Sequence, residues 1–294
     1  MWKAAVSRRF SEKADTYDRY ALVQREMAAE LAAALEAEMP LTNEVRRVVE
    51  VGCGTGGLTS LLRDRCGSAE YLALDIAPGM LEAARRRLGP TGRTCRFVLA
   101  DVEEWIWKQA EQWADLIVSS ACFQWLRQPE RTAEGLYRLL RPGGSLLFAT
   151  FGPRTFWELH DSFSSAYRNL RREPQRHGLS FCTPDEWRAM LDRAGFAGVR
   201  IRTREVRLHY PDVRSFLHAV KGIGASTGPA SDSAGLGQRR LLTEMMEAYR
   251  SRFGGAEGIP VTYELVYVAA ERQEGREKSV GPDRQDILRK KGIV

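Results

Sequence analysis

The residues best suited to chemistry lie in the stretch RVVEVGCGTGGLTSLL at 47–62. An apolar run that carries one acid, Glu50, is followed by a glycine-rich turn and then by apolar residues at helical spacing. The turn contains Gly52, Cys53, Gly54 and Gly56. This order predicts a strand, a tight turn and a helix, an arrangement that binds nucleotide-type cofactors. Glycines let the backbone take positive φ and let a ligand approach closely, but such turns also occur for purely structural reasons.

Two more acidic residues are expected at the ends of strands. The run EYLALD at 70–75 predicts a strand that ends in Asp75, and FVLAD at 97–101 predicts one that ends in Asp101. A carboxylate at the position of Asp75 can accept both hydroxyls of a ribose, and Asp101 can accept a hydrogen bond from an adenine amino group. Alternatively, either carboxylate caps the helix that follows it. Together with the glycine turn, the two acids favour a cofactor that carries a nucleoside.

The elements that would position these residues alternate between strand and helix from residue 46 to residue 151. DLIVSS at 115–120 predicts a fourth strand and SLLFATF at 145–151 a fifth. This alternation is typical of an α/β fold with a parallel, doubly wound sheet. Ligands bind such sheets at the carboxyl ends of the strands. The polar residues expected there are Glu50, Asp75, Asp101 and Ser119.

The flanking segments add helices and two more strands. LVQREMAAELAAALEAEM at 22–39 predicts a helix before the first strand, and aromatic residues in the polar segment before it indicate docking onto the body. Strands are also predicted at 199–208 and 259–268. About fifty residues lie between them, and an insertion of this length with its own helices is predicted to be a lid. The alternative is a tolerated surface insertion.

The composition argues against several classes of protein. The chain has 294 residues and a net charge of +6, but seven Lys/Arg against four Asp/Glu place three of those charges at 272–294. That segment lacks apolar periodicity and predicts a disordered tail, so no nucleic-acid platform is indicated. Five cysteines without a C-x-x-C pair imply neither a disulfide framework nor a metal site. No run has membrane-spanning length, and a cytoplasmic location is expected.

Five motifs together resemble the class I S-adenosylmethionine-dependent methyltransferases. They are EVGCGTG at 50–56, LD at 74–75, ADV at 100–102, DLIVSS at 115–120 and LRPGG at 140–144. The G-x-G-x-G spacing also differs from the G-x-G-x-x-G of dinucleotide-binding enzymes. The resemblance implies a Rossmann-like, seven-stranded, mostly parallel sheet and S-adenosyl-L-methionine as cofactor. The cofactor-binding residues that it implies are Tyr17, Glu50, Gly52, Cys53, Gly54, Gly56, Asp75, Ile76, Met80, Asp101, Val102 and Ser119.

Motifs outside the cofactor region narrow the resemblance. They are FSEKADTYD at 10–18, ALVQ at 21–24, CFQW at 122–125, FGPRT at 151–155, VKGIGA at 220–225 and TYELVY at 262–267. These are similar to the biotin-pathway malonyl-acyl-carrier-protein O-methyltransferases, although the QW pair also resembles trans-aconitate methyltransferases. The implied organisation is one methyltransferase domain over 1–271, followed by the tail at 272–294. Its parts are an N-terminal helical cap (1–45), a cofactor-binding core (46–151), a helical segment (152–198) and a lid (209–258).

The narrower resemblance implies methyl transfer to the free carboxylate of malonyl-acyl-carrier protein, an early step of biotin synthesis. A carboxylate with a pKa of about 4 is ionised at neutral pH, so no general base is expected. The residues expected to orient it are Tyr17, Arg154 and Arg214, with Arg207, Lys221 and His218 as further candidates. Malonyl-CoA stays open as the acceptor. The two alternative hypotheses are a methyltransferase for a free small acid such as trans-aconitate and a non-catalytic methyltransferase-like binding subunit.

Overall fold

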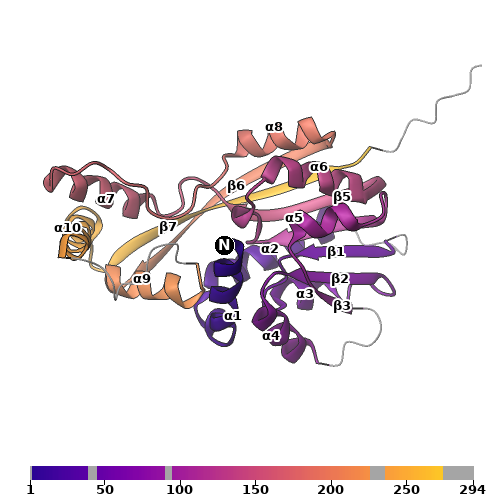
Figure 1. Cartoon of the computed structure of the whole chain (residues 1–294), viewed down its shortest axis with the longest axis horizontal. Coiled ribbons are helices and arrows are strands. Elements are labelled where there is room, and N and C mark those ends of the chain that lie inside the picture. Colours follow the sequence, from indigo (N-terminus) through magenta and orange to yellow (C-terminus); the bar gives the residue numbers. More distant parts are fainter. Residues whose placement is uncertain (1, 39–44, 90–94, 226–235, 274–294) are drawn as a thin grey trace, which may run out of the picture.

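Seven strands form one sheet in the computed structural model, which describes residues 2–38, 45–89, 95–225 and 236–273 (Figure 1). The strand order is β3-β2-β1-β4-β5-β7-β6. The first five strands pair in parallel, and β7 pairs antiparallel with both β5 and β6. The prediction of a mostly parallel, doubly wound sheet is therefore confirmed. The strands are β1 (Arg47–Val51), β2 (Glu70–Asp75), β3 (Cys95–Leu99), β4 (Ala114–Ser120), β5 (Leu140–Phe151), β6 (Ala197–Tyr210) and β7 (Ile259–Glu271).

Helices cover both faces of the sheet because successive strand residues point to opposite sides. Val48 of β1 packs into a core with helices α2 and α3, whereas Val49 and Val51 pack into a second core with α6 and α8. The longer helices are α1 (Trp2–Tyr20), α2 (Leu22–Glu38), α4 (Pro78–Leu88), α6 (Pro129–Leu139), α7 (Trp157–Asn169), α8 (Pro184–Ala194), α9 (Val213–Gly222) and α10 (Leu236–Phe253). Short helices are α3 (Gly57–Leu62), α5 (Val102–Trp105), η1 (Ile106–Lys108) and η2 (Phe123–Trp125). None of the helices in the described ranges is long and apolar enough to span a bilayer.

The insertion between β6 and β7 carries two helices, as the sequence predicted for this segment. Helices α9 and α10 lie with α7 at the end of the molecule where β6 and β7 extend beyond the parallel strands (Figure 1). Helix α10 packs against α7, and α9 contacts α1. The Gly, Ser and Pro-rich part of the insertion falls largely on residues 226–235, which lie outside the described residues. Helices α7, α9 and α10 thus lie together at one end of the sheet (Figure 1).

The N-terminal segment forms helix α1, which packs across α4. Gly79 permits this approach, because a Cβ atom there would stand 2.7 Å from the carbonyl oxygen of Ser11. Ion pairs Arg86–Asp15 and Arg87–Asp18 join the same two helices. Docking of this aromatic-containing segment agrees with the expectation from the sequence. It places α1 over the carboxyl ends of the parallel strands.

Arg272 differs from the sequence expectation, which made it the first residue of a disordered tail. Its guanidinium donates hydrogen bonds to the carbonyl oxygens of Tyr137 and Leu140, each at 2.9 Å. Its backbone pairs with Gly143 and Gly144, so the antiparallel pairing of β5 with β7 continues past Glu271. The strand β5 begins at Leu140, earlier than the expected residue 145, because Leu140 pairs with Ala114 of β4. The rest of the predicted tail, 274–294, lies outside the described residues.

A buried carboxylate joins α7 to β7. Glu158 has no exposed side-chain surface, and it accepts hydrogen bonds from the Thr262 hydroxyl and, at 3.2 Å, from the Thr262 backbone N–H. Since buried polar groups are costly without partners, this contact specifies how α7 packs against the sheet. The apolar residues of α7, among them Phe163, are thereby held in position.

We expect Glu158→Ala to lower the free energy of unfolding by about 2–4 kcal/mol, because both Thr262 donors would lose their acceptor in a dry site. Urea unfolding followed by circular dichroism measures this change. Glu134→Ala, at an exposed position of α6, is the matched control and should change stability by less than about 0.5 kcal/mol. Equal effects of the two substitutions would contradict the anchoring role.

Candidate functional site

The glycine turn after β1 is tightly packed on one side and open on the other. Gly52, Gly54 and Gly56 all have positive φ, of 70°, 54° and 81°. A Cβ atom at Gly52 would lie 2.3 Å from the Sγ of Cys122, whereas one at Gly54 would meet no atom within 4 Å. The backbone at Gly54 thus faces free space, where a ligand can approach it closely.

Asp75 ties this turn to the second strand. One carboxylate oxygen accepts the Gly54 backbone N–H at 2.8 Å, and the other accepts the Ala77 N–H at 2.8 Å. Burial raises the pKa of Asp75 to about 6, although the hydrogen bonds from Ala77 and Gly54 lower it. At neutral pH the group is therefore mostly ionised. Each oxygen has a further lone pair that can accept a ligand hydroxyl.

Glu50 lies buried beneath the turn, with 1% of its surface exposed. One oxygen accepts hydrogen bonds from the hydroxyls of Thr59 and Tyr71, each at 2.7 Å. Burial raises the pKa of Glu50 to about 7, although these two hydrogen bonds lower it. The acid therefore titrates near neutral pH and links β1, α3 and β2 from inside the core.

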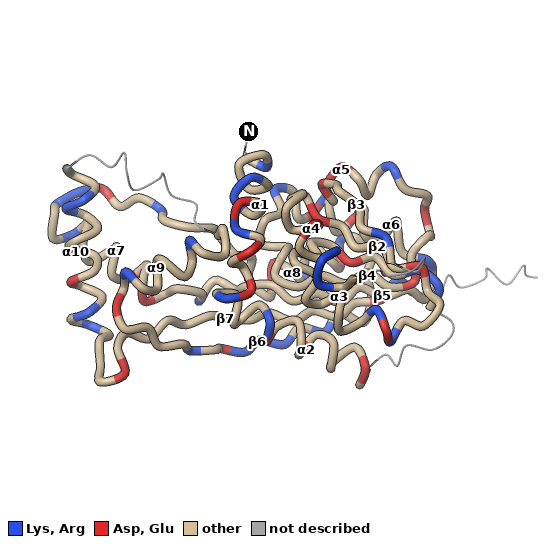
Figure 2. The backbone as a smooth tube through the Cα atoms, turned by 90° about the horizontal axis from the view of Figure 1, so that it is seen from below, with Lys and Arg blue, Asp and Glu red and all other residues tan. Residues whose placement is uncertain are grey.

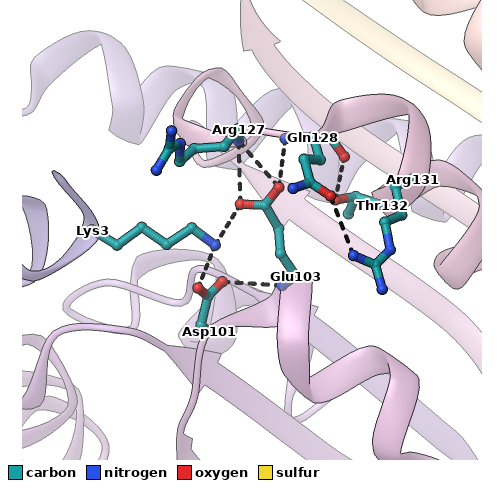
Figure 3. Close-up of polar contacts among 7 residues, drawn as sticks. All are labelled: Lys3, Asp101, Glu103, Arg127, Gln128, Arg131 and Thr132. Carbon is teal, nitrogen blue, oxygen red and sulfur yellow. Dashed lines mark hydrogen bonds and ion pairs between the residues drawn. The ribbon is translucent and has the colours of Figure 1, made fainter. Parts of the chain in front are cut away.

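Helix α1 closes the space in front of the turn through several polar contacts. The Lys3 amine pairs with the carboxylates of Asp101 and Glu103, and Glu103 also accepts backbone N–H groups of Arg127 and Gln128 (Figure 3). At the other end of α1, Asp18 accepts the Thr55 hydroxyl at 2.8 Å. These contacts hold the helix across the strand ends.

Asp101 has two roles in this arrangement. One oxygen accepts the Glu103 backbone N–H at 3.0 Å and caps α5, while the other faces Lys3 (Figure 3). Burial would raise the pKa of Glu103, but hydrogen bonds from Lys3, Gln128 and Arg127 lower it below its ordinary value. The Asp101 carboxylate thus caps α5, which is the alternative considered from the sequence, and it also lies in the wall of a cavity.

A first cavity lies between α1, the glycine turn and the ends of β1, β2 and β4. It brings together ten of the twelve residues expected to bind the cofactor. They are Tyr17, Glu50, Gly52, Cys53, Gly54, Asp75, Ile76, Met80, Asp101 and Val102. Gly56 and Ser119 do not line it. Ser119 is fully buried and donates its hydroxyl to the Val51 carbonyl at 2.8 Å, so it joins β4 to β1.

Sequence reasoning missed part of this wall. Trp2, Lys3 and Val6 come from α1, and Ser120 and Trp125 lie at and after the end of β4. The Ser120 hydroxyl is buried without a hydrogen-bond partner among the described residues, which leaves it free for a ligand. The N-terminal aromatics signalled that the segment docks, but no local pattern indicated which residues it would present.

A second cavity of about 360 Å³ continues from the first toward the helical end of the molecule. Its walls are mostly apolar side chains of α7, α9, α10 and the loop before α8, including Phe163, Leu217 and Leu241, and Tyr263 of β7 also lines it. Lys221 is the one Lys or Arg among its lining residues in the described part of the chain. The residues that line both cavities are Phe10, Tyr17, Gln24, Ala121 and Trp125.

Most of the cationic residues that were expected to orient the acceptor carboxylate line neither of the two cavities in the described chain. The Arg154 guanidinium pairs with Glu205 of β6, and Arg214 is exposed on α9; neither is among the residues that line the two cavities in the described chain. Arg207 is exposed on β6, and His218 lies 3.4 Å from the Tyr20 hydroxyl. Among those candidates, Tyr17 and Lys221 reach the second cavity.

Tyr17 lies where the two cavities meet. Burial, with the negative charges of Asp75 and Asp18, raises the pKa of its hydroxyl well above the ordinary value. The group is therefore a neutral O–H donor at physiological pH. The described residues contain no group of three or more His, Cys, Asp and Glu placed to hold a metal ion.

Comparison with known proteins agrees with this geometry. The family model described as "Methyltransferase domain" matches residues 48–144. Malonyl-[acyl-carrier protein] O-methyltransferase of Brevibacillus brevis is 50% identical over 92% of this chain and 96% of its own length. The protein of the same name from a Paenibacillus species is 41% identical over 91% of this chain and 98% of its own. The fold also matches Haemonchus contortus phosphoethanolamine N-methyltransferase 2 in complex with S-adenosyl-L-methionine (TM-score 0.55, 14% identity, 90% of this chain and 57% of that one).

The raised pKa of Glu50 predicts how stability depends on pH. Since folding raises the pKa from 4.5 to about 7, the fold favours the protonated acid, and this stabilising contribution is lost as the pH rises through 7. Glu50→Gln keeps an acceptor oxygen but does not ionise. Between pH 5 and pH 8 the wild type should therefore lose about 1–3 kcal/mol of stability that Glu50→Gln does not lose.

Urea unfolding at both pH values measures this difference. Glu82→Gln, at an exposed position of α4, is the control and should keep the wild-type dependence on pH. If Glu50→Gln and the wild type show the same dependence, the acid does not titrate in the folded protein near neutral pH.

Proposed function

The chain belongs to the malonyl-[acyl-carrier protein] O-methyltransferase family, and from this premise we propose that it transfers a methyl group from S-adenosyl-L-methionine to the free carboxylate of malonyl-acyl-carrier protein. The observation that carries the proposal is the junction of two cavities. One lies at the glycine turn and strand-end acids, and the other is an apolar cavity that meets it at Tyr17 and Trp125.

The first cavity has the groups that the cofactor requires. Asp75 would accept the ribose hydroxyls, and the open backbone at Gly54 allows close approach of the ligand. Ile76, Met80 and Val102 supply apolar wall beside Asp101, where an adenine ring would lie. The unpartnered Ser120 hydroxyl offers one more polar contact.

When bound, S-adenosyl-L-methionine supplies a methyl group on a positively charged sulfur. The acceptor carboxylate is already ionised at neutral pH, so the chain needs no base to activate it. The protein's task is to align the carboxylate oxygen with the methyl group, and such orientation can contribute about 7–11 kcal/mol. Because opposite charges are neutralised in the reaction, exclusion of water by α1 and the lid helices also favours it.

The second cavity favours an acyl thioester over a free polyacid. Its lining is mostly apolar and extends from Tyr17 to Leu241 and Leu242 on α10, which suits a long, uncharged arm with one carboxylate at its tip. A tricarboxylate such as trans-aconitate would need several cations, whereas Lys221 is the one Lys or Arg among the lining residues that the structure describes. We therefore place the malonyl carboxylate at the junction and the arm along the cavity.

Basic residues gather beside the α10 end of this cavity. Arg168, Arg171, Arg172 and Arg176 follow one another at and after the end of α7, with Glu173 as the acid among them, and Arg239 and Arg240 lie near the start of α10. Arg172 donates to the Gly237 carbonyl at 3.0 Å, so the two segments touch. None of these six arginines forms an ion pair within the described chain. Figure 2 shows the Lys and Arg positions on α10 at this end.

Unpaired cations at a cavity mouth attract a negatively charged partner and increase its rate of association. We propose that an acidic face of the carrier protein docks on this group while its acylated arm enters the cavity. The other substrate form, malonyl-CoA, carries its negative charge on phosphates and would use fewer of these contacts.

The test of the proposed function is transfer of label from methyl-labelled S-adenosyl-L-methionine to malonyl-carrier, malonyl-CoA and trans-aconitate. We expect malonyl-carrier to be methylated with the highest kcat/KM. Asp75→Ala should weaken binding of S-adenosylhomocysteine by about 10-fold or more, because a hydrogen bond to a charged group contributes about 1.5–3 kcal/mol. Label on trans-aconitate with none on the malonyl thioesters would overturn the proposal, and labelling of no acceptor would favour a binding subunit.

Charge reversal tests the docking surface. We expect Arg239→Glu with Arg240→Glu to raise the KM for malonyl-carrier by about 10-fold or more, because attraction becomes repulsion. The KM for malonyl-pantetheine, which lacks the carrier, should stay unchanged. Arg96→Glu with Lys108→Glu makes the same change in net charge at exposed positions of β3 and η1 and is the control. Equal effects of both double substitutions would show that only net charge matters.

A further inference from the structure

The acceptor carboxylate must lie at the junction of the two cavities, since methyl transfer requires contact between the reacting atoms. Five residues line both cavities: Phe10, Tyr17, Gln24, Ala121 and Trp125. Phe10 and Ala121 have no polar side-chain atoms. The side-chain donors at the junction are therefore the Tyr17 hydroxyl, the Gln24 amide and the Trp125 indole N–H.

Gln24 reaches the junction because of its position on α2. Gln24, Arg25 and Ala28 of α2 line the first cavity, as does Ala21 directly before the helix. Their spacing of i, i+3, i+4 and i+7 places them on one face. Val23, Met27 and Leu31 are buried in the core. Within the cavity-lining face, Gln24 is the residue that also lines the second cavity.

The Gln24 amide has free hydrogen-bonding capacity. It is half-buried and makes no hydrogen bond to another described residue. Gln124, also in the second cavity, differs: its amide donates to the Ala121 carbonyl at 2.7 Å, and its oxygen accepts the Thr150 hydroxyl at 3.0 Å. Gln124 is thus held by the protein, whereas Gln24 is available to a ligand.

A neutral donor suits this reaction better than a cation. The carboxylate is negatively charged before transfer and loses that charge as the new C–O bond forms. A guanidinium would stabilise the starting anion more than the transition state and would slow the reaction. An amide N–H can orient the anion with less of this stabilisation. The placement of Arg154 and Arg214 away from the cavities agrees with that requirement.

We infer that the Gln24 side-chain amide donates a hydrogen bond to the acceptor carboxylate and, together with the Tyr17 hydroxyl, orients it toward the methyl group. This assignment rests on the proposed function, because it assumes a carboxylate acceptor. Gln24 then selects a carboxylate over an uncharged acyl terminus. It does so without taking up a proton.

Binding to the protein saturated with S-adenosylhomocysteine tests this role without requiring turnover. We expect Gln24→Met to lower the affinity for malonyl-pantetheine by about 10-fold or more and to leave the affinity for acetyl-pantetheine, which has no carboxylate, unchanged. Affinity for S-adenosylhomocysteine should stay within about twofold. Glu36→Met, at an exposed position of the same helix, is the matched control and should change none of the three.

The pH dependence of turnover gives a second test. Gln24→Glu replaces the donor by a carboxylate, so its kcat/KM for malonyl-carrier should fall by about 100-fold at pH 8 and recover toward pH 6 as the acid becomes protonated and donates again. Wild-type affinity for malonyl-pantetheine in Gln24→Met, or equal losses for malonyl and acetyl forms, would overturn the assignment. A wild-type protein that binds malonyl-pantetheine through Gln24 but does not methylate it would overturn only the proposed function.

Discussion

The structure depends on the hydrogen bonds that Asp75 accepts from the backbone of two different elements. Three positive-φ glycines turn the chain sharply after β1, and such a turn exposes N–H groups that need acceptors. Asp75 accepts one from Gly54 and another from Ala77, so the turn after β1 and the start of α4 share one carboxylate. The same residue lines the first cavity. A single side chain therefore both fixes the backbone of two elements and forms part of the cavity wall.

Helix α1 completes a site that the sheet alone leaves open. Its contacts are polar at both ends, Lys3 with Asp101 and Asp18 with Thr55, and close-packed near the middle at Ser11 and Gly79. Polar contacts of this kind specify an orientation without burying a large apolar surface. The cover over the first cavity is thus formed by the N-terminal helix and not by the sheet, and this helix also supplies Tyr17 to the junction of the two cavities.

Charged side chains are distributed unevenly around the second cavity. The walls of the second cavity are nearly uncharged, whereas unpaired arginines lie beside its α10 end in the described part of the chain. A surface cation accelerates encounter with an acidic partner at little cost, because water solvates it. A cation at the reaction centre would instead stabilise the anion that must react. Neutral donors at the junction and cations at the rim follow from the same electrostatic reasoning.

The sequence by itself determined the order of elements, the glycine turn and the strand-end acids, because each is a pattern among residues that are neighbours in the chain. Tertiary structure decided which side chains reach the site. Arg154 suited an acceptor site by type, but Glu205, 51 positions along the chain, takes its guanidinium. Lys3 and Asp101 meet across 98 positions, and Gln24 gains its place only when α2 packs beside the cavity junction. Contacts of this kind depend on how whole elements pack, and no local pattern encodes them.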